Sequence, residues 1–210
     1  MSAIPLTLFQ QHVLKWKDCR RCHLCEKRQR VVFARGDVPC QVLFIGEAPG
    51  ESEDCLGQPF VGPAGHRMQY IVDQALLGEW TYCLTNIVCC IPRGGDGKKS
   101  GAPDWESIEA CAPRLRQFVK ICDPVMIVCV GGLARDALDS KLRGGIKFHK
   151  PLSYTAPHPE GAIACFDIIH PSFIQRALVA QRGLMTQRCI VKIQQALDEL
   201  TMKPEEVEGA

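Results

Sequence analysis

Four runs of apolar residues, separated from one another by helix-forming segments, constrain the fold of this chain most strongly. The runs are QVLFIG (41–46), YCLTNIV (82–88), VMIVCVG (125–131) and AIACFDIIH (162–170). Their nearly continuous apolar character is typical of strands that are covered on both faces. Strands of this kind, alternating with helices, predict an α/β fold with a mainly parallel sheet.

Helical spacing of apolar residues marks the segments between these runs. LTLFQQHVLKW (6–16) follows Pro5, and a proline suits the start of a helix. DWESIEACAPRLRQFVKIC (104–122) begins at Asp104, a residue type that caps helix N-termini. The other expected helices are GHRMQYIVDQALL (65–77), GLARDALDS (132–140) and RGLMTQRCIVKIQQALDEL (182–200).

Length and composition fit one globular domain. The chain has 210 residues, of which 46% are hydrophobic and 23% are charged, and these values are ordinary for a soluble protein. We expect a single domain over residues 1–200 and a disordered tail at 201–210. The glycine-rich, basic stretch IPRGGDGKKSGAP (91–103) is expected to form a loop.

The sequence carries no signal for a membrane. No stretch approaches 18 consecutive apolar residues, and the N-terminus lacks the basic and apolar regions of a signal peptide. We therefore expect a cytoplasmic protein with no membrane partner, and we expect a monomer. The net charge of +2 does not by itself require a nucleic acid, although basic residues can still cluster on one face.

Cysteine is the unusual residue type, with 13 copies in the chain. An odd count without a signal peptide argues against a disulfide framework. Cys129 and Cys165 lie inside expected strands, where a thiol packs as a small apolar side chain. These two cysteines are therefore predicted to belong to the core.

A different group of cysteines has the spacing of a metal or redox site. CRRCHLC (19–25) contains C-x-x-C, whose short turn lets two thiolates face one ion, and Cys90 and Cys111 follow further along. Zinc and an iron–sulfur cluster on four thiolates both fit this spacing. A thioredoxin-like redox pair is less favoured, because that motif follows a strand and opens a helix.

Polar residues gather where the expected strands end. GEAPGESED (46–54) follows the first run, Asn86 lies in the second, and HPS (170–172) closes the fourth. Ligands of parallel sheets bind beyond the carboxyl ends of the strands, so these segments predict one site at a shared rim. Taken singly, His170 would cap a helix that begins at Pro171, and Asn86 would satisfy a turn.

The segment GEAPGESED does not suit a dinucleotide. Its glycines are spaced G-x-x-x-G, and Glu47 between them would repel a pyrophosphate. A carboxylate at this point suits a developing positive charge, a water molecule to be oriented or deprotonated, or an N–H donor. The expected ligand is therefore polar and carries no negative charge where it meets the turn.

Seven motifs stand in order along the chain. They are the C-x-x-C of Cys19 and Cys22, RVVFARGD (30–37), GEAPGESED, GQPFVGPAG (57–65), TNIVCC (85–90), Cys111 and HPSFIQR (170–176). In this order they resemble the family-4 type of uracil-DNA glycosylase, and the resemblance runs through about residues 19–200.

The resemblance implies a fold, an activity and a cofactor. The fold is a three-layer α/β/α sandwich with a short, mainly parallel central sheet. The activity is hydrolysis of the N-glycosidic bond of a flipped-out uracil, or a related or modified pyrimidine, in DNA, which leaves an abasic site. The cofactor is a [4Fe-4S] cluster, with zinc as the less favoured alternative.

Carried over position by position, the resemblance places the cluster on the four family cysteines. The expected ligands are Cys19, Cys22, Cys90 and Cys111. Cys25 and Cys89 are additional thiols beside them. The expected role of the cluster is structural: it ties the N-terminal segment to the loop 90–111, while a redox-sensing role stays open.

The expected base pocket has four parts. Phe60 stacks on the flipped pyrimidine, and the Asn86 amide reads its O4 and N3–H, a pattern that cytosine reverses. The Ala48 amide holds O2. His170 donates a hydrogen bond to the same oxygen as negative charge develops there during bond cleavage.

Carboxylates and basic residues complete the expected site. Glu47 lines the pocket, and Glu53 or Asp54 orients the attacking water. The stretch Ser172–Phe173–Ile174 offers an apolar wedge that fills the gap left by the flipped base. Candidate phosphate-binding residues are Arg176, Arg182, Arg188, Lys98 and Lys99.

Two departures and one alternative accompany the resemblance. Residues 91–110 contain no histidine, whereas some relatives carry one there that traps the sugar covalently, so turnover is predicted. The segment FHKPLSYTAPHPEG (148–161) is able to reshape the pocket for a modified pyrimidine, although its histidines, His149 and His158, are more typical of the surface. The alternative function is a non-catalytic DNA-binding or replication-accessory module with the same fold.

Overall fold

The computed structural model describes residues 6–94, 101–139, 148–149 and 163–201. Pro5, Lys98, Lys99 and His158 lie outside these ranges, as do the expected tail beyond Thr201 and most of the segment 148–161. Within the ranges, no helix is both long enough and apolar enough to cross a lipid bilayer.

A six-stranded sheet forms the centre of the molecule. Its strands are β1 (Ala34–Gly36), β2 (Val42–Gly46), β3 (Tyr82–Asn86), β4 (Met126–Val130), β5 (Phe148–His149) and β6 (Ile163–Ile168). They lie in the order β1-β3-β2-β4-β6-β5, and every neighbouring pair is parallel except β1 and β3. The mainly parallel sheet is confirmed, and the short antiparallel edge strand β1 was not expected.

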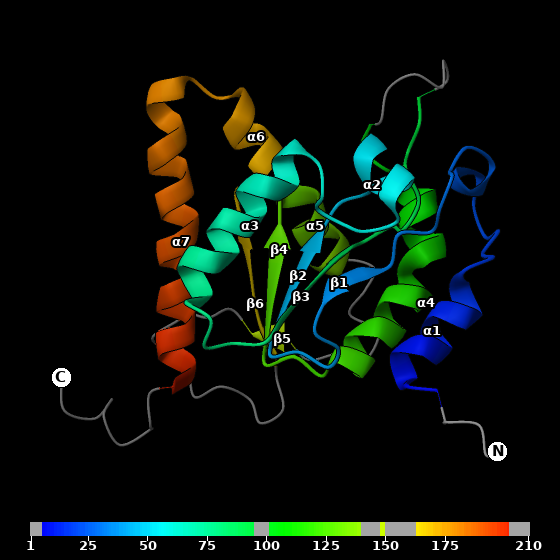
Figure 1. Ribbon diagram of the computed structural model, residues 1–210, viewed down its shortest axis with the longest axis horizontal. Helices are drawn as coiled ribbons and strands as arrows, with labels where there is room; N and C mark the ends of the chain where they lie inside the picture. The colour runs from blue at the N-terminus through cyan, green and yellow to red at the C-terminus, as the bar shows by residue number, and fades with distance from the viewer. Residues whose placement is uncertain (1–5, 95–100, 140–147, 150–162, 202–210) are drawn as a thin grey trace.

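Helices cover both faces of this sheet, as Figure 1 shows. On one face lie α3 (Pro63–Leu76), α6 (Pro171–Arg176) and α7 (Val179–Thr201). On the other lie α1 (Leu8–Trp16), α4 (Trp105–Cys122) and α5 (Gly132–Ala137). The expected three-layer α/β/α sandwich is therefore confirmed. Two further short elements are the 3-10 helix η1 (His23–Glu26) and α2 (Glu51–Leu56).

The continuous apolar runs reflect a core on each side of the sheet. Because successive strand residues point to opposite faces, Phe44 packs with α3 and α7 while Leu43 packs with α4. Cys129 is fully buried on the α4 side, and its Sγ lies 3.9 Å from that of Cys165. The prediction is confirmed for Cys129, whereas Cys165 is partly buried and packs against the same core.

Helix starts follow the sequence signals in part. Asp104 caps α4 as expected, since its Oδ1 accepts from the Ser107 amide at 2.8 Å. Helix α1 is capped by Thr7, whose hydroxyl accepts from the Gln10 amide at 3.1 Å. Helix α7 begins at Val179, three residues before its expected start.

Strand register brings the carboxyl ends of the strands to one edge. Gly46 lies opposite Asn86 on β3, and Val130 lies opposite Ile168 on β6. In Figure 1 this is the upper edge of the sheet, where α2 and α6 lie. The segments predicted to share a rim therefore do share one.

Candidate active site and cysteine site

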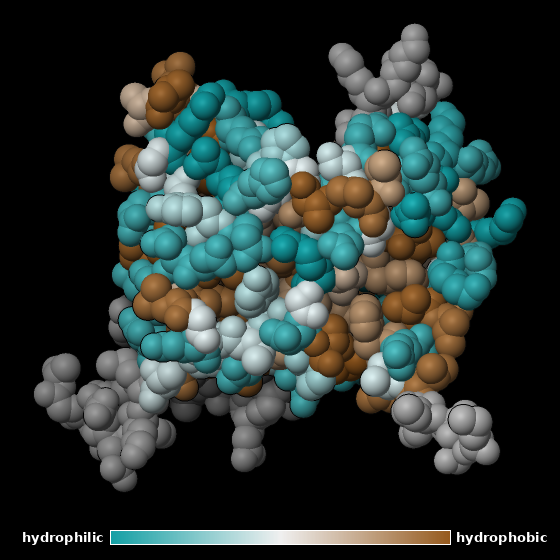
Figure 2. Space-filling view, viewed as in Figure 1, coloured by the Kyte–Doolittle hydropathy of each residue, from teal (hydrophilic) through white to brown (hydrophobic). Residues whose placement is uncertain are grey.

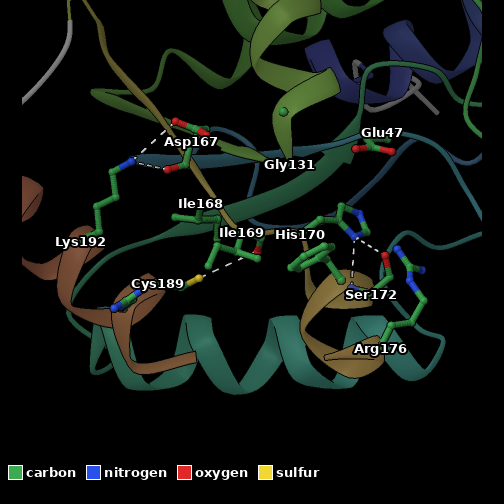
Figure 3. A pocket seen from close by; sticks show the side chains of 13 residues that line it. Glu47, Gly131, Asp167, Ile168, Ile169, His170, Ser172, Arg176, Cys189 and Lys192 are labelled. Atoms are coloured by element: carbon green, nitrogen blue, oxygen red, sulfur yellow. Dashed lines mark hydrogen bonds and ion pairs between the residues drawn. The ribbon is translucent and has the colours of Figure 1, made fainter. Parts of the chain in front are cut away.

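A cavity of about 470 Å³ opens at this edge of the sheet. Figure 2 shows the same edge hollowed between the corner of α6 and α7 and the side that carries α2. The lining residues that matter most are Glu47, Gly131, Asp167, His170, Arg176 and Lys192. Figure 3 shows Glu47, His170 and Arg176 toward one end of the cavity, and Asp167 with Lys192 at the other.

Glu47 and His170 meet at Gly131, the residue that follows β4. A Cβ atom on Gly131 would lie 2.8 Å from Oε1 of Glu47 and 3.3 Å from Cδ2 of His170. Gly131 also has a φ of 103°, which L side chains rarely adopt. The absence of a side chain here lets the carboxylate and the imidazole approach each other.

His170 both caps a helix and faces the cavity. It is the N-cap of α6, and its Nδ1 accepts a hydrogen bond from the Ser172 amide at 3.2 Å. The Ser172 hydroxyl lies 2.7 Å from the same nitrogen. Because Nδ1 is an acceptor, a neutral ring carries its proton on Nε2.

Burial sets the charge state of both groups. It lowers the pKa of His170 to about 4, and the positive charge of Arg176 acts in the same direction. It raises the pKa of Glu47, while Arg176 opposes that shift. The imidazole is therefore neutral near pH 7, and the carboxyl group takes up a proton more readily than an ordinary glutamate.

Phe60 and Asn86 lie together behind Gly46. A Cβ atom on Gly46 would lie 2.5 Å from Cζ of Phe60 and 2.5 Å from Oδ1 of Asn86. Both side chains are buried, and neither lines the cavity. The structure thus brings the two predicted base-binding residues together, with the half-buried Ala48 two residues after Gly46.

A clamp of hydrogen bonds holds Phe60 in an unusual conformation. Its φ is 56°, a left-handed value that is uncommon outside glycine. Arg35 on β1 donates to the Phe60 carbonyl at 3.2 Å and to the Pro59 carbonyl at 3.1 Å. Glu53 accepts from the amides of Val61 and Gly62, at 3.0 and 2.8 Å. Neighbouring residues therefore fix where the ring lies.

Asp54 is a structural residue, so the expectation that it orients a water is corrected, and Glu53 is held by hydrogen bonds in the same region. Besides the two amides above, Glu53 accepts from the Gly50 amide at 3.1 Å. Asp54 is 0% exposed, accepts from the Gln29 amide at 2.9 Å and pairs with Arg93 at 3.1 Å. Neither carboxylate lines the cavity. Through these hydrogen bonds, both side chains join α2 to the loops around it.

The expected wedge also needs a correction. Ile174 is 0% exposed and packs into the core beneath α6, so it cannot enter a DNA duplex. Phe173 remains available, because it is 54% exposed and lines the cavity. Leu178 and Val179, at the corner of α6 and α7, are 72% and 77% exposed, and apolar side chains stand out at this corner in Figure 2.

The basic residues of this region differ in their surroundings. Arg176 and Arg188 are exposed and line the cavity. Arg182 donates to the Ala177 carbonyl at 3.0 Å, which ties α7 to the end of α6. Lys192 donates to the Asp167 carbonyl at 2.6 Å. Among the arginines that the structure describes in this region, Arg176 and Arg188 are therefore best placed to bind a phosphate.

A second, smaller cavity is lined by six cysteines. They are Cys19, Cys22, Cys25, Cys89, Cys90 and Cys111. They come from three elements, namely the segment after α1, the loop after β3 and helix α4. Arg21 joins the first to the last by donating to the Ala110 carbonyl at 3.0 Å. The structure therefore gathers all four predicted ligands together with both additional thiols.

Two arginines flank these thiols. Arg28 donates to the Cys90 sulfur at 3.3 Å. Burial raises the pKa of Cys90 to about 11, and the charge and the hydrogen bond of Arg28 oppose that rise. A hydrogen bond from Cys89 and the charge of Arg114 lower the pKa of Cys111 despite its burial. Positive charge close to the sulfurs favours thiolates, the form that binds metals.

The chemistry of these thiols suits either zinc or an iron–sulfur cluster. A zinc ion takes its sulfurs at about 2.3 Å from one centre, and an iron–sulfur cluster takes one cysteine at each of several irons. Among the described residues, no three His, Cys, Asp or Glu side chains form a group able to hold a metal ion.

Comparison with known proteins decides the family. The sequence profile described as the Uracil DNA glycosylase superfamily matches residues 33–197. The chain belongs to the uracil-DNA glycosylase superfamily. The match starts after Cys25, so the N-terminal cysteines lie outside it.

Individual members of this superfamily agree with the family-4 resemblance. A type-4 uracil-DNA glycosylase of Sulfurisphaera tokodaii is 32% identical over 159 residues, which cover 74% of this chain and 70% of the relative. One of Pyrobaculum aerophilum is 34% identical over 122 residues, or 58% and 60% of the two chains. One of Thermotoga maritima is 32% identical over 118 residues, or 56% and 59%. The chain thus spans less than two thirds of the last two relatives.

Some residues of the site could not be recognised from the sequence alone. Gly131 and the Arg35 clamp on Phe60 matter only through contacts with distant segments. Arg114 carried a local signal, because it is a cation on the apolar face of an amphipathic helix, three residues after Cys111. A charge in that position indicates a buried ion pair or hydrogen-bond network.

Proposed function

We propose that this protein hydrolyses the N-glycosidic bond of uracil, or of a related pyrimidine, flipped out of DNA, and leaves an abasic site. The observation that carries the proposal is the meeting of Glu47 and His170 at Gly131, where both line the cavity. Asn86 and Phe60 meet at Gly46, the residue directly before Glu47. The relatives named type-4 uracil-DNA glycosylases support it.

The base enters the rim beside Gly46 in this proposal. Phe60 offers a ring to stack against, and the Asn86 amide has the donor and the acceptor that N3–H and O4 of uracil require. The Ala48 amide meets O2 in this proposal. A glycine at position 46 is required, because any side chain there would collide with both Phe60 and Asn86.

His170 acts on the leaving base. When the bond between N1 and the sugar breaks, its electron pair stays with the base and negative charge develops on O2. The proton on Nε2 of the neutral imidazole is directed to that oxygen, since Nδ1 is already an acceptor for Ser172. Burial keeps the ring neutral, with a pKa of about 4.

Glu47 acts on the sugar and on water. As the base leaves, positive charge develops on the sugar, and a carboxylate nearby stabilises that charge. The same carboxylate orients the water that attacks the anomeric carbon and accepts its proton. Glu47 takes this role alone, because Glu53 and Asp54 are engaged elsewhere.

DNA contact in this proposal falls on the rim around α6. Phe173 fills the gap that the flipped base leaves, with Leu178 and Val179 as further exposed apolar side chains. Arg176 and Arg188 meet phosphates beside it. Ser172 supports His170 rather than DNA, since its amide and hydroxyl both face the imidazole.

The cysteine site holds a [4Fe-4S] cluster in this proposal, with Cys19, Cys22, Cys90 and Cys111 as ligands. Its support is the gathering of these thiols in one cavity beside Arg28 and Arg114. The cluster supplies a rigid link between the N-terminal segment, the loop after β3 and α4. The proposal includes action as a monomer in the cytoplasm, in keeping with 13 free cysteines.

Excision assays test the function directly. Anaerobically purified protein is incubated with oligonucleotides that carry uracil, hypoxanthine or a modified cytosine, and alkali then cleaves the strand at abasic sites. Cleavage of the uracil strand is expected, with repeated turnover because residues 91–110 contain no histidine. DNA binding without cleavage of any of these strands would support the accessory-module alternative instead.

A further inference from the structure

Arg114 lies between the cysteine site and the base-reading end of β3. It is 2% exposed, on the buried face of α4. Its Nη2 donates to the Asn86 carbonyl at 2.6 Å and to the Ile87 carbonyl at 3.1 Å. Its Nη1 donates to the Thr85 hydroxyl at 3.3 Å. One side chain therefore holds three consecutive residues around the expected base reader.

The other side of Arg114 faces sulfur. Cys111 lies one turn before Arg114 on α4, and Cys89 and Cys90 follow shortly after the segment that Arg114 holds. Burial lowers the pKa of Arg114, while the negative charges of these cysteines raise it. The Nε atom is buried and has no hydrogen-bond partner within the described ranges. A buried charge is costly unless negative charge or hydrogen bonds compensate it.

The groups at the end of β3 and directly after it that accept from Arg114 are all uncharged, namely one hydroxyl and two carbonyls. The neighbouring thiols add negative charge beside Arg114 when they bind a metal as thiolates. The connectivity agrees: one backbone stretch carries both Asn86 and Cys90, and α4 carries both Cys111 and Arg114. Arg114 links these two segments.

We propose that Arg114 is a positioning residue that couples the charge of the cysteine site to base recognition. With thiolates beside it, its guanidinium fixes the carbonyls of Asn86 and Ile87 and so aims the Asn86 amide at the base. This inference rests on the proposed function, in which Asn86 reads the base and the thiols bind a cluster.

The first test compares Arg114→Lys with Arg28→Lys. Lysine keeps the positive charge at either position but lacks the planar fork that reaches several acceptors at once. Arg114→Lys is expected to keep its iron, to excise uracil about tenfold or more slowly, and to discriminate less well against cytosine. Arg28→Lys, which alters the contact to Cys90, is expected to keep the discrimination of wild type.

A double-mutant cycle separates positioning from general damage. If Arg114 works through Asn86, the loss caused by Arg114→Lys should shrink to about twofold or less in an Asn86→Ala background, because interacting residues are not additive. Additive losses would overturn the inference, and so would an Arg114→Lys protein with the discrimination of wild type.

A second kind of measurement does not depend on catalysis. It uses the fact that coupling between base binding and the cysteine site must act in both directions. If thiolate charge aids base binding, bound base must in turn stabilise the cysteine site, and couplings of this kind are typically about fivefold or more. The iron-loaded wild type is therefore expected to release iron to a chelator about fivefold more slowly with saturating free uracil. Arg28→Lys should keep that protection and Arg114→Lys should lose it.

Each result has a defined consequence. If Arg114→Lys does not fold, wild type alone decides, and iron release that is unaffected by uracil overturns the inference. A wild type that excises uracil and carries iron, but shows no coupling, leaves the proposed function standing and removes only the role of Arg114. A wild type without iron or without excision overturns the proposed function, and this inference with it.

Discussion

The cavity at the strand ends and the cysteine site are built in different ways. Glu47, Gly131 and His170 each follow the end of a strand, so the register of the parallel sheet sets where they lie. The cysteines come from a segment after α1, a loop and a helix, joined by contacts such as that between Arg21 and Ala110.

Because of this difference, we expect substitutions in the two regions to affect different properties of the protein. A cavity side chain can be removed without disturbing the sheet that carries it, so its loss should affect the reaction and spare the fold. A cysteine ligand joins segments that the sheet itself does not hold together, so its loss should affect the fold first. Arg114 joins the end of β3, which carries Asn86, to the helix that carries Cys111.

The largest expected effect concerns iron. Cys90→Ala is expected to lose all bound iron, the visible absorbance of the thiolate-ligated cluster and most of its soluble yield. Cys129→Ala is the matched control, since Cys129 is also buried but packs inside β4, and it should keep full iron. Iron per protein after anaerobic purification is the measurement. Full iron in Cys90→Ala, or stoichiometric zinc in wild type, would contradict the ligand assignment.

A smaller effect is expected on base choice. Asn86→Asp replaces the amide donor by an acceptor, so it should mismatch O4 of uracil and suit the exocyclic amine of cytosine. A mispaired hydrogen bond in a buried pocket costs about 1–3 kcal/mol, which predicts a shift of roughly 10- to 100-fold in the ratio of uracil to cytosine excision. Single-turnover rates on matched oligonucleotides measure it. An unchanged ratio would mean that another residue reads the base.

The pH dependence should show the smallest change. Because burial raises the pKa of Glu47, protonation removes its carboxylate at a higher pH than for an ordinary glutamate. The single-turnover rate should then fall about tenfold per pH unit below that pKa. His170, with a pKa of about 4, should add no step near pH 6.5. Glu47→Gln should be slow and lack this dependence, and an acid limb that survives in Glu47→Gln would assign it elsewhere.

The regular part of the fold could be predicted because its signals are local. Nearly continuous apolar runs identified β2, β3, β4 and β6, and helical spacing identified α3 and α4. Strand β1 was missed because its three residues, Ala34–Gly36, show no apolar run, and its place comes from pairing with β3. Helix α2 was missed because its acidic residues suggested a ligand.

The site shows the same limit. Glu47 and His170 could be placed at the rim because both follow strand ends. The roles of Glu53 and Asp54 could not be predicted, because their partners Val61, Gly62 and Gln29 lie elsewhere in the chain. Ile174 was misplaced because the sequence does not tell which side of so short a helix faces the core.

The central claim is that the cavity performs the chemistry, and His170→Ala tests it most directly. The measurement is the single-turnover rate of uracil excision beside equilibrium affinity for uracil-containing DNA, both at one fixed salt concentration. We expect the rate to fall by roughly 10²–10³-fold, the usual loss for one oxyanion donor. We expect affinity and iron content to change little, because this hydrogen bond is weak before the glycosidic bond breaks. Equal losses of rate and affinity would make His170 a binding residue and contradict the claim.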